Sequence, residues 1–145
     1  MAARAAAPLY TPEMLALAVE LAGYPPLDHV AARGEAVSRT CGSTIAIDLG
    51  LAPDDTVGEV GMRVSACAVG QAAAALFARG AAGRTAADIA QAERAVAGWL
   101  EGGALPEWPG IEAIAAARDY PGRHGAIALP WRAACAALSK KDGAG

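Results

Sequence analysis

The sequence has no long run of basic residues, and this absence bears on its partners. No run of Lys or Arg exceeds Lys140-Lys141, and the formal net charge is −3. Nothing in the chain would neutralise a row of phosphates along a nucleic acid. We therefore expect no nucleic-acid partner.

A long apolar segment is also missing at the N-terminus. The first seven residues contain alanines and one arginine, and Pro8 interrupts them. We expect neither a signal peptide nor a membrane span, and hence no membrane partner.

Cysteine is scarce, and its odd number of three favours free or metal-bound thiols in a reducing compartment. The expected location is the cytoplasm.

Patterns that would support independent catalysis are missing too. The chain shows no Ser/His/Asp arrangement, no phosphate-binding loop and no cofactor fingerprint, so we expect no enzymatic turnover of its own.

Aromatic residues are only 5% of the chain, but 54% of residues are hydrophobic, which argues against disorder. A length of 145 residues fits one domain over 1–145, with residues 1–8 and 140–145 expected to be flexible.

Alternating apolar residues predict a small sheet in the first half of the chain. The clearest alternation covers Thr44–Leu51, and a second covers Thr56–Ser65 after the turn at Pro53. A shorter candidate strand covers Ala36–Thr40. These segments predict a three-stranded antiparallel meander with one buried face.

Helical periods flank this sheet. Thr11 can cap a first helix that starts at Pro12, with an apolar stripe of Met14, Leu15, Leu17, Ala18 and Leu21. A second helix is predicted over Ala68–Arg79, stopped by Gly80, and a third begins at Thr85, which has a capping-box-like pattern. Two more are predicted over Ile111–Arg118 and Gly125–Ser139, and Pro130 marks a first turn or a kink in the last one. The expected fold class is α+β, with the helices packed on one face of the sheet.

Two of the three cysteines occupy positions that favour an exposed thiolate. Cys41 stands in a Cys-Gly turn, and Cys67 stands where a strand runs into an alanine-rich helix. Unpaired amides and the dipole at a helix start favour thiolate, the species that attacks sulfur or binds metal. Because the second and third strands form a hairpin, we expect its base to bring the two residues together. Zinc or iron takes about four ligands, so two thiolates alone are too few.

Four short motifs follow one another along the chain: Cys41-Gly42, the run from Ala66 to Ala72, Tyr120-Pro121-x-Arg123, and Leu129-Pro130-Trp131. Together they resemble the motifs of the iron–sulfur cluster assembly scaffolds, the IscU, NifU N-terminal and SufU proteins. The last two look most like the SufU branch. The resemblance covers nearly the whole chain.

The resemblance implies a set of ligands, and here that set is degenerate. The family gathers cluster or zinc with three cysteines and an aspartate, and some members place a histidine beside the third cysteine. Cys41 and Cys67 match two ligands, and His124 falls at the position of the histidine, so the resemblance makes it the candidate third ligand. Ser43 stands at the aspartate position and Gly125 at the third cysteine.

The other candidate ligands are interpreted as structural. Cys135 lies about ten residues beyond the third-cysteine position, which is about 15 Å along a helix, so we expect it to be a small buried apolar residue. His29 is expected to be a solvated loop residue.

The expected function follows from the resemblance. It is an iron–sulfur cluster assembly scaffold or a sulfur or cluster carrier, which binds iron or an Fe–S cluster through Cys41 and Cys67, with Cys41 as a sulfur acceptor. The implied partners are a cysteine desulfurase and recipient Fe–S proteins, and a homodimer is one option for completing the site. Two alternatives stay open: a metal-free adaptor that binds other assembly proteins, and a zinc-dependent sulfur acceptor.

Overall fold

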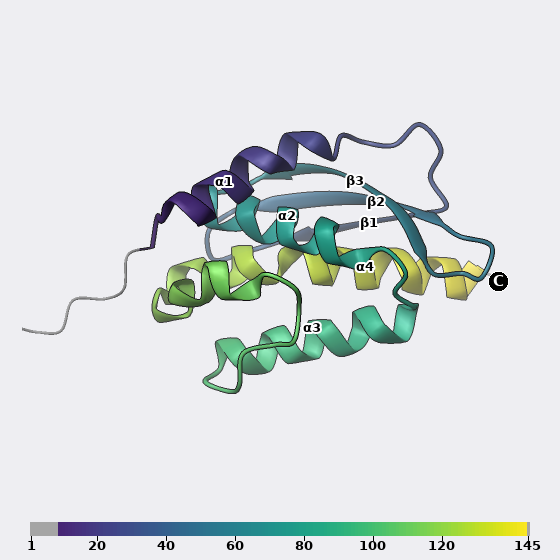
Figure 1. Ribbon diagram of the computed structural model, residues 1–145. Helices are drawn as coiled ribbons and strands as arrows, with labels where there is room; N and C mark the ends of the chain where they lie inside the picture. The colour runs from purple at the N-terminus through teal and green to yellow at the C-terminus, as the bar shows by residue number, and fades with distance from the viewer. Residues whose placement is uncertain (1–8, 145) are drawn as a thin grey trace, which may run out of the picture.

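Three antiparallel strands in the order β1-β2-β3 form the sheet of this protein, and helices cover one of its faces (Figure 1). The computed structural model describes residues 9–144, and the side chains of residues 9–139. The elements are α1 (Pro12–Glu20), η1 (Leu21–Gly23), β1 (Ala32–Val37), β2 (Thr44–Leu51), β3 (Val57–Ser65), α2 (Ala68–Ala81), α3 (Ala86–Leu100), η2 (Ile111–Asp119), η3 (Pro121–Arg123) and α4 (His124–Ala144).

The helices form layers on the buried face of the sheet. α4 packs on β1 and β2, and α2 packs on β3 beside α4. α1 lies against α2, and α3 lies against the outer side of α4. The α+β class and the packing of helices on one face are therefore confirmed. The expectation of flexible ends falls on residues 1–8 and 140–145, outside the part whose side chains the structure describes.

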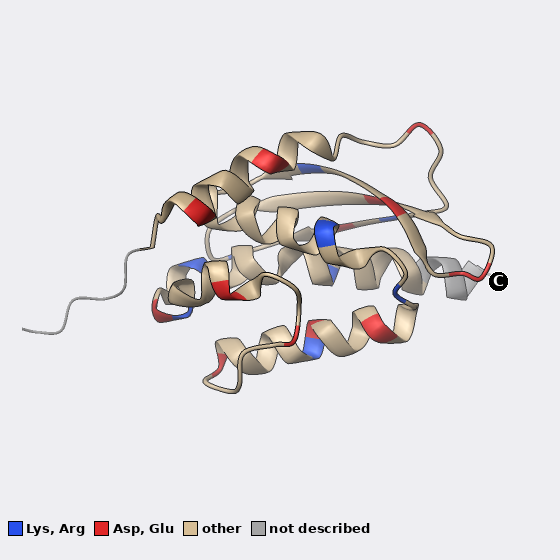
Figure 2. Ribbon diagram, viewed as in Figure 1, with Lys and Arg blue, Asp and Glu red and all other residues tan. Residues whose placement is uncertain are grey.

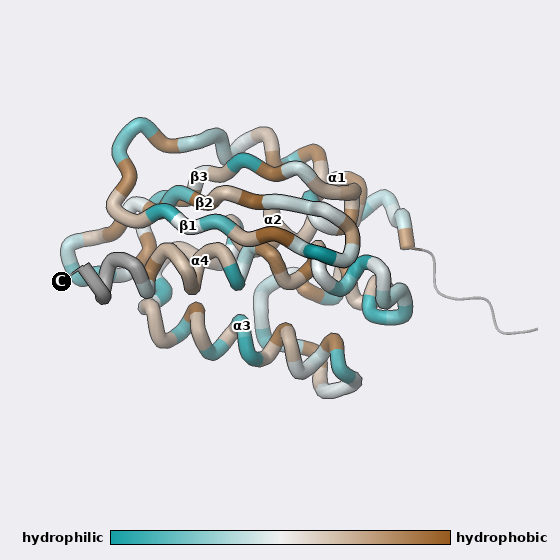
Figure 3. Tube along the Cα trace, turned by 180° about the vertical axis from the view of Figure 1, so that it is seen from behind, coloured by the Kyte–Doolittle hydropathy of each residue, from teal (hydrophilic) through white to brown (hydrophobic). Residues whose placement is uncertain are grey.

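The hairpin of β2 and β3 follows the sequence pattern closely. Thr44 pairs with Ser65 and Ile47 with Met62, and Ile45, Ile47 and Leu49 are buried as predicted. Hydrophilic and apolar residues alternate along the strands (Figure 3). This alternation gives the sheet its single helix-covered face.

The first strand lies earlier than predicted. β1 runs over Ala32–Val37, so only Ala36 and Val37 of the expected strand at Ala36–Thr40 belong to it, because the residues from Ser38 to Ser43 form a tight turn. The inward positions of β1 include Ala32 and Gly34, which are too small to give a clear hydrophobic signal. Gly34 is required there, since a Cβ on it would collide with the backbone of α4 at Ala133.

The other face of the sheet is partly covered by the segment after η1. Asp48 points to this face, as the alternation predicts, but its side chain is only 4% exposed. Its carboxylate accepts hydrogen bonds from Arg33 Nε at 2.7 Å and from the Leu27 amide at 3.1 Å. The loop is thereby fixed to the sheet.

Three aromatic side chains form the centre of the helical layer. The rings of Phe77 and Trp108 stack at 5.5 Å, and Trp131 meets both rings edge-on. Trp108 also donates from Nε1 to the Leu76 carbonyl oxygen at 2.8 Å. Gly80 makes room for Trp108, because a Cβ on Gly80 would lie 2.7 Å from that nitrogen. Gly80 therefore does not stop α2, as the sequence suggested, but lies inside it.

The remaining differences concern helix starts and types. α1 begins as predicted, with the Thr11 side chain accepting from the Met14 amide at 3.1 Å, although Leu15 of the predicted stripe is exposed. The segment at Ile111–Asp119 is a 3-10 helix. α4 starts at His124 and continues through Pro130, which neither begins nor ends it.

Within the described chain, no helix combines the length and the apolar character needed to cross a membrane.

Candidate functional site

The turn between β1 and β2 holds Cys41 with its side chain exposed. Backbone hydrogen bonds of 2.8 Å join the Ser38 amide to the Ser43 carbonyl and the Gly42 amide to the Ser38 carbonyl. Gly42 adopts φ = +76°, a left-handed conformation that glycine accepts without strain. Gly42 is thus the residue whose conformation allows the chain to reverse here.

Two buried hydroxyl groups contact the thiol of Cys41. Its Sγ lies 3.3 Å from Ser38 Oγ and 3.1 Å from Ser43 Oγ, and the two serines are 3% and 5% exposed. A serine hydroxyl can rotate to accept from a thiol or to donate to a thiolate. Hydrogen bonds from Ser38 and then from Ser43 favour the thiolate, so they lower the pKa of Cys41 below its ordinary value.

Cys67 occupies the N-cap position of α2. Its backbone is extended, at φ −66° and ψ 171°, and its half-buried side chain makes no capping hydrogen bond. Gln71 Nε2 donates to the Ala66 carbonyl at 2.9 Å and fixes the entry to the helix. Because Thr44 pairs with Ser65, Cys67 and the turn that contains Cys41 lie at the same end of the sheet.

Arg123 is a site residue that the sequence did not single out beyond its motif. It ends η3, and its Nη2 donates to the Tyr10 hydroxyl at 3.3 Å. The pKa of Arg123 is raised first by this hydrogen bond and then by the charges of Tyr10, Cys67 and Cys41, so the guanidinium interacts electrostatically with both cysteines. Its Nε is buried and has no hydrogen-bond partner among the described residues.

Ser38 is the second residue that the sequence did not single out, because it was assigned to a strand. It packs directly against Gly125 in the first turn of α4. A Cβ at position 125 would overlap Ser38 Oγ and would lie 3.0 Å from Ser38 Cβ. The space next to Gly125 is therefore already filled by the serine that contacts Cys41.

His124 is half-buried at the start of α4, and its Nε2 lies 2.6 Å from the Arg118 carbonyl oxygen. A carbonyl only accepts, so Nε2 carries the proton and Nδ1 is left for any other contact. Among the described side chains, those of residues 9–139, no group of three or more His, Cys, Asp or Glu that could hold a metal ion is found. Ligation by His124 stays a prediction.

The two residues interpreted as structural lie apart from this turn. Cys135 is half-buried in α4, with Sγ 3.9 Å from the Ile89 carbonyl oxygen, and burial raises its pKa. His29 is exposed in the loop before β1.

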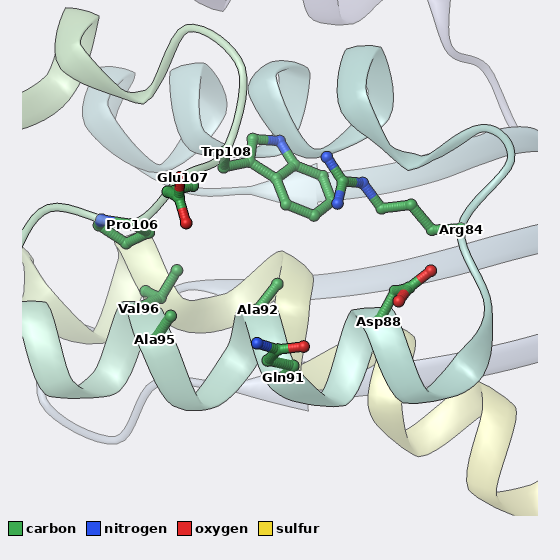
Figure 4. A pocket seen from close by; sticks show the side chains of 9 residues that line it. All are labelled: Arg84, Asp88, Gln91, Ala92, Ala95, Val96, Pro106, Glu107 and Trp108. Atoms are coloured by element: carbon green, nitrogen blue, oxygen red, sulfur yellow. The ribbon is translucent and has the colours of Figure 1, made fainter.

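Neither a stripe of charge nor the cavity along α3 marks the turn that holds Cys41 in the described chain. Acidic and basic side chains are interspersed over the helices and loops (Figure 2). A cavity of about 240 Å³ lies along α3, where the Arg84 guanidinium stacks 4.0 Å above the Trp108 ring (Figure 4). None of the candidate site residues lines this cavity.

Comparisons with known proteins give matches among solved structures. No protein-family model matches the chain, and no curated protein matches it. The N-terminal part of a nitrogen-fixing NifU-like protein from Brucella abortus superimposes with a TM-score of 0.86 and 28% identity, over 94% of this chain and 96% of that one.

Two further structures, at lower identity, show the same fold. One is a putative iron–sulfur cluster assembly scaffold protein of the SUF system from Fervidobacterium islandicum AW-1, with a TM-score of 0.80 and 18% identity over 90% of this chain and 96% of that one. The other is a hypothetical protein, with a TM-score of 0.72 and 19% identity over 87% and 96%. The resemblance found in the sequence is confirmed.

Proposed function

We propose that this chain, which has the fold of the NifU-like and SufU scaffold proteins, works in iron–sulfur cluster assembly as a scaffold or carrier. The observation that carries the proposal is the exposed Cys41 thiol, held by two hydroxyl groups at the same end of the sheet as Cys67. An exposed sulfur of lowered pKa is suited to receive sulfur or to bind a soft cation.

In this proposal iron or an Fe–S cluster is cargo rather than a resident cofactor. Cys41 and Cys67 supply two thiolates, and Nδ1 of His124 is the candidate third ligand. An external thiol, a water molecule or a second subunit completes the coordination. Few strong bonds make the cargo labile, which suits a carrier that receives sulfur from a cysteine desulfurase and passes cargo to recipient Fe–S proteins.

Anaerobic reconstitution with iron and sulfide tests the proposal. The wild-type protein is expected to gain visible absorption and bound iron, and Cys41→Ala and Cys67→Ala are each expected to lose both. Cys135→Ala is the matched control and should retain them, because Cys135 lies apart from the turn. A wild-type protein that stays colourless and binds neither iron nor zinc would contradict the proposal.

A metal-free adaptor is the second candidate, and the lack of a three-ligand group in the described chain favours it. Such a protein would dock a desulfurase or another assembly factor without carrying metal. Binding of a desulfurase should then survive the double change Cys41→Ala and Cys67→Ala. The third candidate, a zinc-dependent sulfur acceptor, requires zinc in freshly purified protein, which metal analysis separates from iron.

A further inference from the structure

Two hydroxyl groups that can donate hydrogen bonds contact the sulfur of Cys41, those of Ser38 and Ser43. Arg123 is the cation whose charge interacts with both Cys41 and Cys67. Its buried Nε has no acceptor in the described part of the chain, and arginine keeps its charge and only donates. The sulfur therefore has two donors in direct contact and interacts with one fixed positive charge.

This arrangement suits an anionic sulfur that is held before any metal ion binds. The chain has a neutral serine at position 43 and a glycine at position 125, so neither a carboxylate nor a thiolate adds negative charge there. The space beside Gly125 is taken by Ser38, so a side chain from α4 cannot enter it without displacing the serine.

We propose that Ser38, Ser43 and Arg123 form a donor cradle that holds an anionic terminal sulfur on Cys41, as a persulfide, without any metal ion. The inference rests on the proposed function, because it specifies the form in which the sulfur cargo is carried. The cradle takes over the role that metal coordination would otherwise play in stabilising the negative charge on sulfur.

The loading step balances without an external oxidant. The Cys41 thiolate attacks the terminal sulfur of a persulfide or polysulfide donor, so a new S–S bond forms at Cys41 and the S–S bond of the donor breaks. The donor thiolate leaves with the electron pair, and the proton of the transferred sulfur goes to solvent. The added atom lies one S–S bond, about 2 Å, from Cys41 Sγ, which keeps it near the same donors.

Loading with sodium polysulfide in the presence of EDTA tests the cradle. After excess reagent is removed, intact mass spectrometry and cyanolysis count the sulfur added per chain, and the decay of that sulfur under a fixed concentration of dithiothreitol gives its lifetime. The wild-type protein is expected to add sulfur at Cys41 with no metal present. A hydrogen bond to a charged group is worth enough that Ser38→Ala, Ser43→Ala and Arg123→Gln should each shorten the lifetime about tenfold.

Matched controls are available elsewhere in the chain. Ser139→Ala removes an exposed hydroxyl in the C-terminal half of α4, and Arg118→Gln removes a guanidinium that contacts the Gly103 carbonyl. Both should leave the lifetime unchanged. Because Arg123→Gln changes a partly exposed side chain, it keeps the test decisive should Ser38→Ala fail to fold.

Two results would overturn the cradle while leaving the proposed function in place. One is normal loading with unchanged lifetimes in Ser43→Ala and Arg123→Gln. The other is uptake that EDTA abolishes and zinc or iron restores. If the wild-type protein takes up no sulfur from polysulfide, the cradle is also refuted, and the separate iron reconstitution then decides whether the proposed function survives.

Discussion

At the residue scale, the contact between Gly125 and Ser38 sets the limits of the site. These residues come from the first turn of α4 and from the position after β1, and the contact leaves no space for a side chain at position 125. The groups in direct contact with Cys41 Sγ are the uncharged hydroxyls of Ser38 and Ser43.

Introducing a thiol at position 125 tests this contact. Gly125→Cys alone should lower the free energy of unfolding by about 1–3 kcal/mol, because its Cβ would overlap the Ser38 side chain. Combining it with Ser38→Gly should recover most of the stability and raise the iron bound per chain in anaerobic reconstitution. Urea denaturation and metal analysis provide the readouts. Wild-type stability in Gly125→Cys alone would mean that the serine moves aside freely.

Asp48 gives a second prediction at this scale. Burial would raise the pKa of its carboxyl, but hydrogen bonds from Arg33 and the Leu27 amide and the charges of Arg33 and Arg63 outweigh burial, so its pKa is lowered. A lowered pKa stabilises the fold above the unfolded value near pH 4, and that stability is lost as the pH falls through the folded pKa.

Asp48→Asn should therefore lower the free energy of unfolding at pH 7 by about 1–3 kcal/mol. Below about pH 4, the free energy of unfolding of the variant should fall less steeply with decreasing pH than that of the wild type. Urea midpoints measured across this range give the comparison. Asp119→Asn, at an exposed carboxylate, is the control. An acid profile identical to that of the wild type would show that Asp48 does not fix the loop to the sheet.

At the element scale, α2 and α3 show how packing decides the effect of a helix glycine. Gly80 of α2 lies against the Trp108 ring, whereas Gly98 of α3 has no atom within 4 Å of a Cβ built on it. The two glycines look alike in the sequence, since each is surrounded by residues that favour a helix.

Gly98→Ala should raise the free energy of unfolding by about 0.5–1 kcal/mol, because alanine restricts the unfolded chain more than glycine does. Gly80→Ala should instead lower it by about 1–3 kcal/mol through the collision with Trp108. Thermal and urea unfolding of the two variants provide the measurement. Stabilisation by both would refute the close packing of Trp108 on α2.

At the scale of the whole molecule, the sequence predicted those features that depend on local patterns. The alternation in Thr44–Leu51 and the Thr11 cap both gave correct elements, because their signals lie within a few residues. β1 was misplaced because its buried alanine and glycine positions are recognised only once α4 packs on them.

The site was predicted only in part, because only some of its residues belong to local sequence patterns. Motif order identified Cys41 and Cys67, whose common end of the sheet follows from the hairpin register. Ser38 and Arg123 were missed as site residues, since their roles arise from contacts between segments far apart in the sequence. No local pattern reports such contacts.

The folded molecule should also rank its three thiols by reactivity. With iodoacetamide near neutral pH, Cys41 should react first, because it is exposed and its pKa is lowered, and Cys135 last, because burial raises its pKa. Half-buried Cys67 should fall between them. Peptide mass spectrometry over a time course gives the order, and the differences should vanish in urea. Equal rates in the native protein would contradict this ranking.

The close fit of glycine and serine beside Cys41 also restricts how this protein can evolve. A lineage that acquires cysteine at position 125 first meets a steric clash, and one that loses the serine first gives up a hydrogen bond and leaves a gap. Each single step is unfavourable, and only the pair of changes together makes room for a thiol at position 125. The two positions should therefore change together, so that a thiol at position 125 is difficult to acquire.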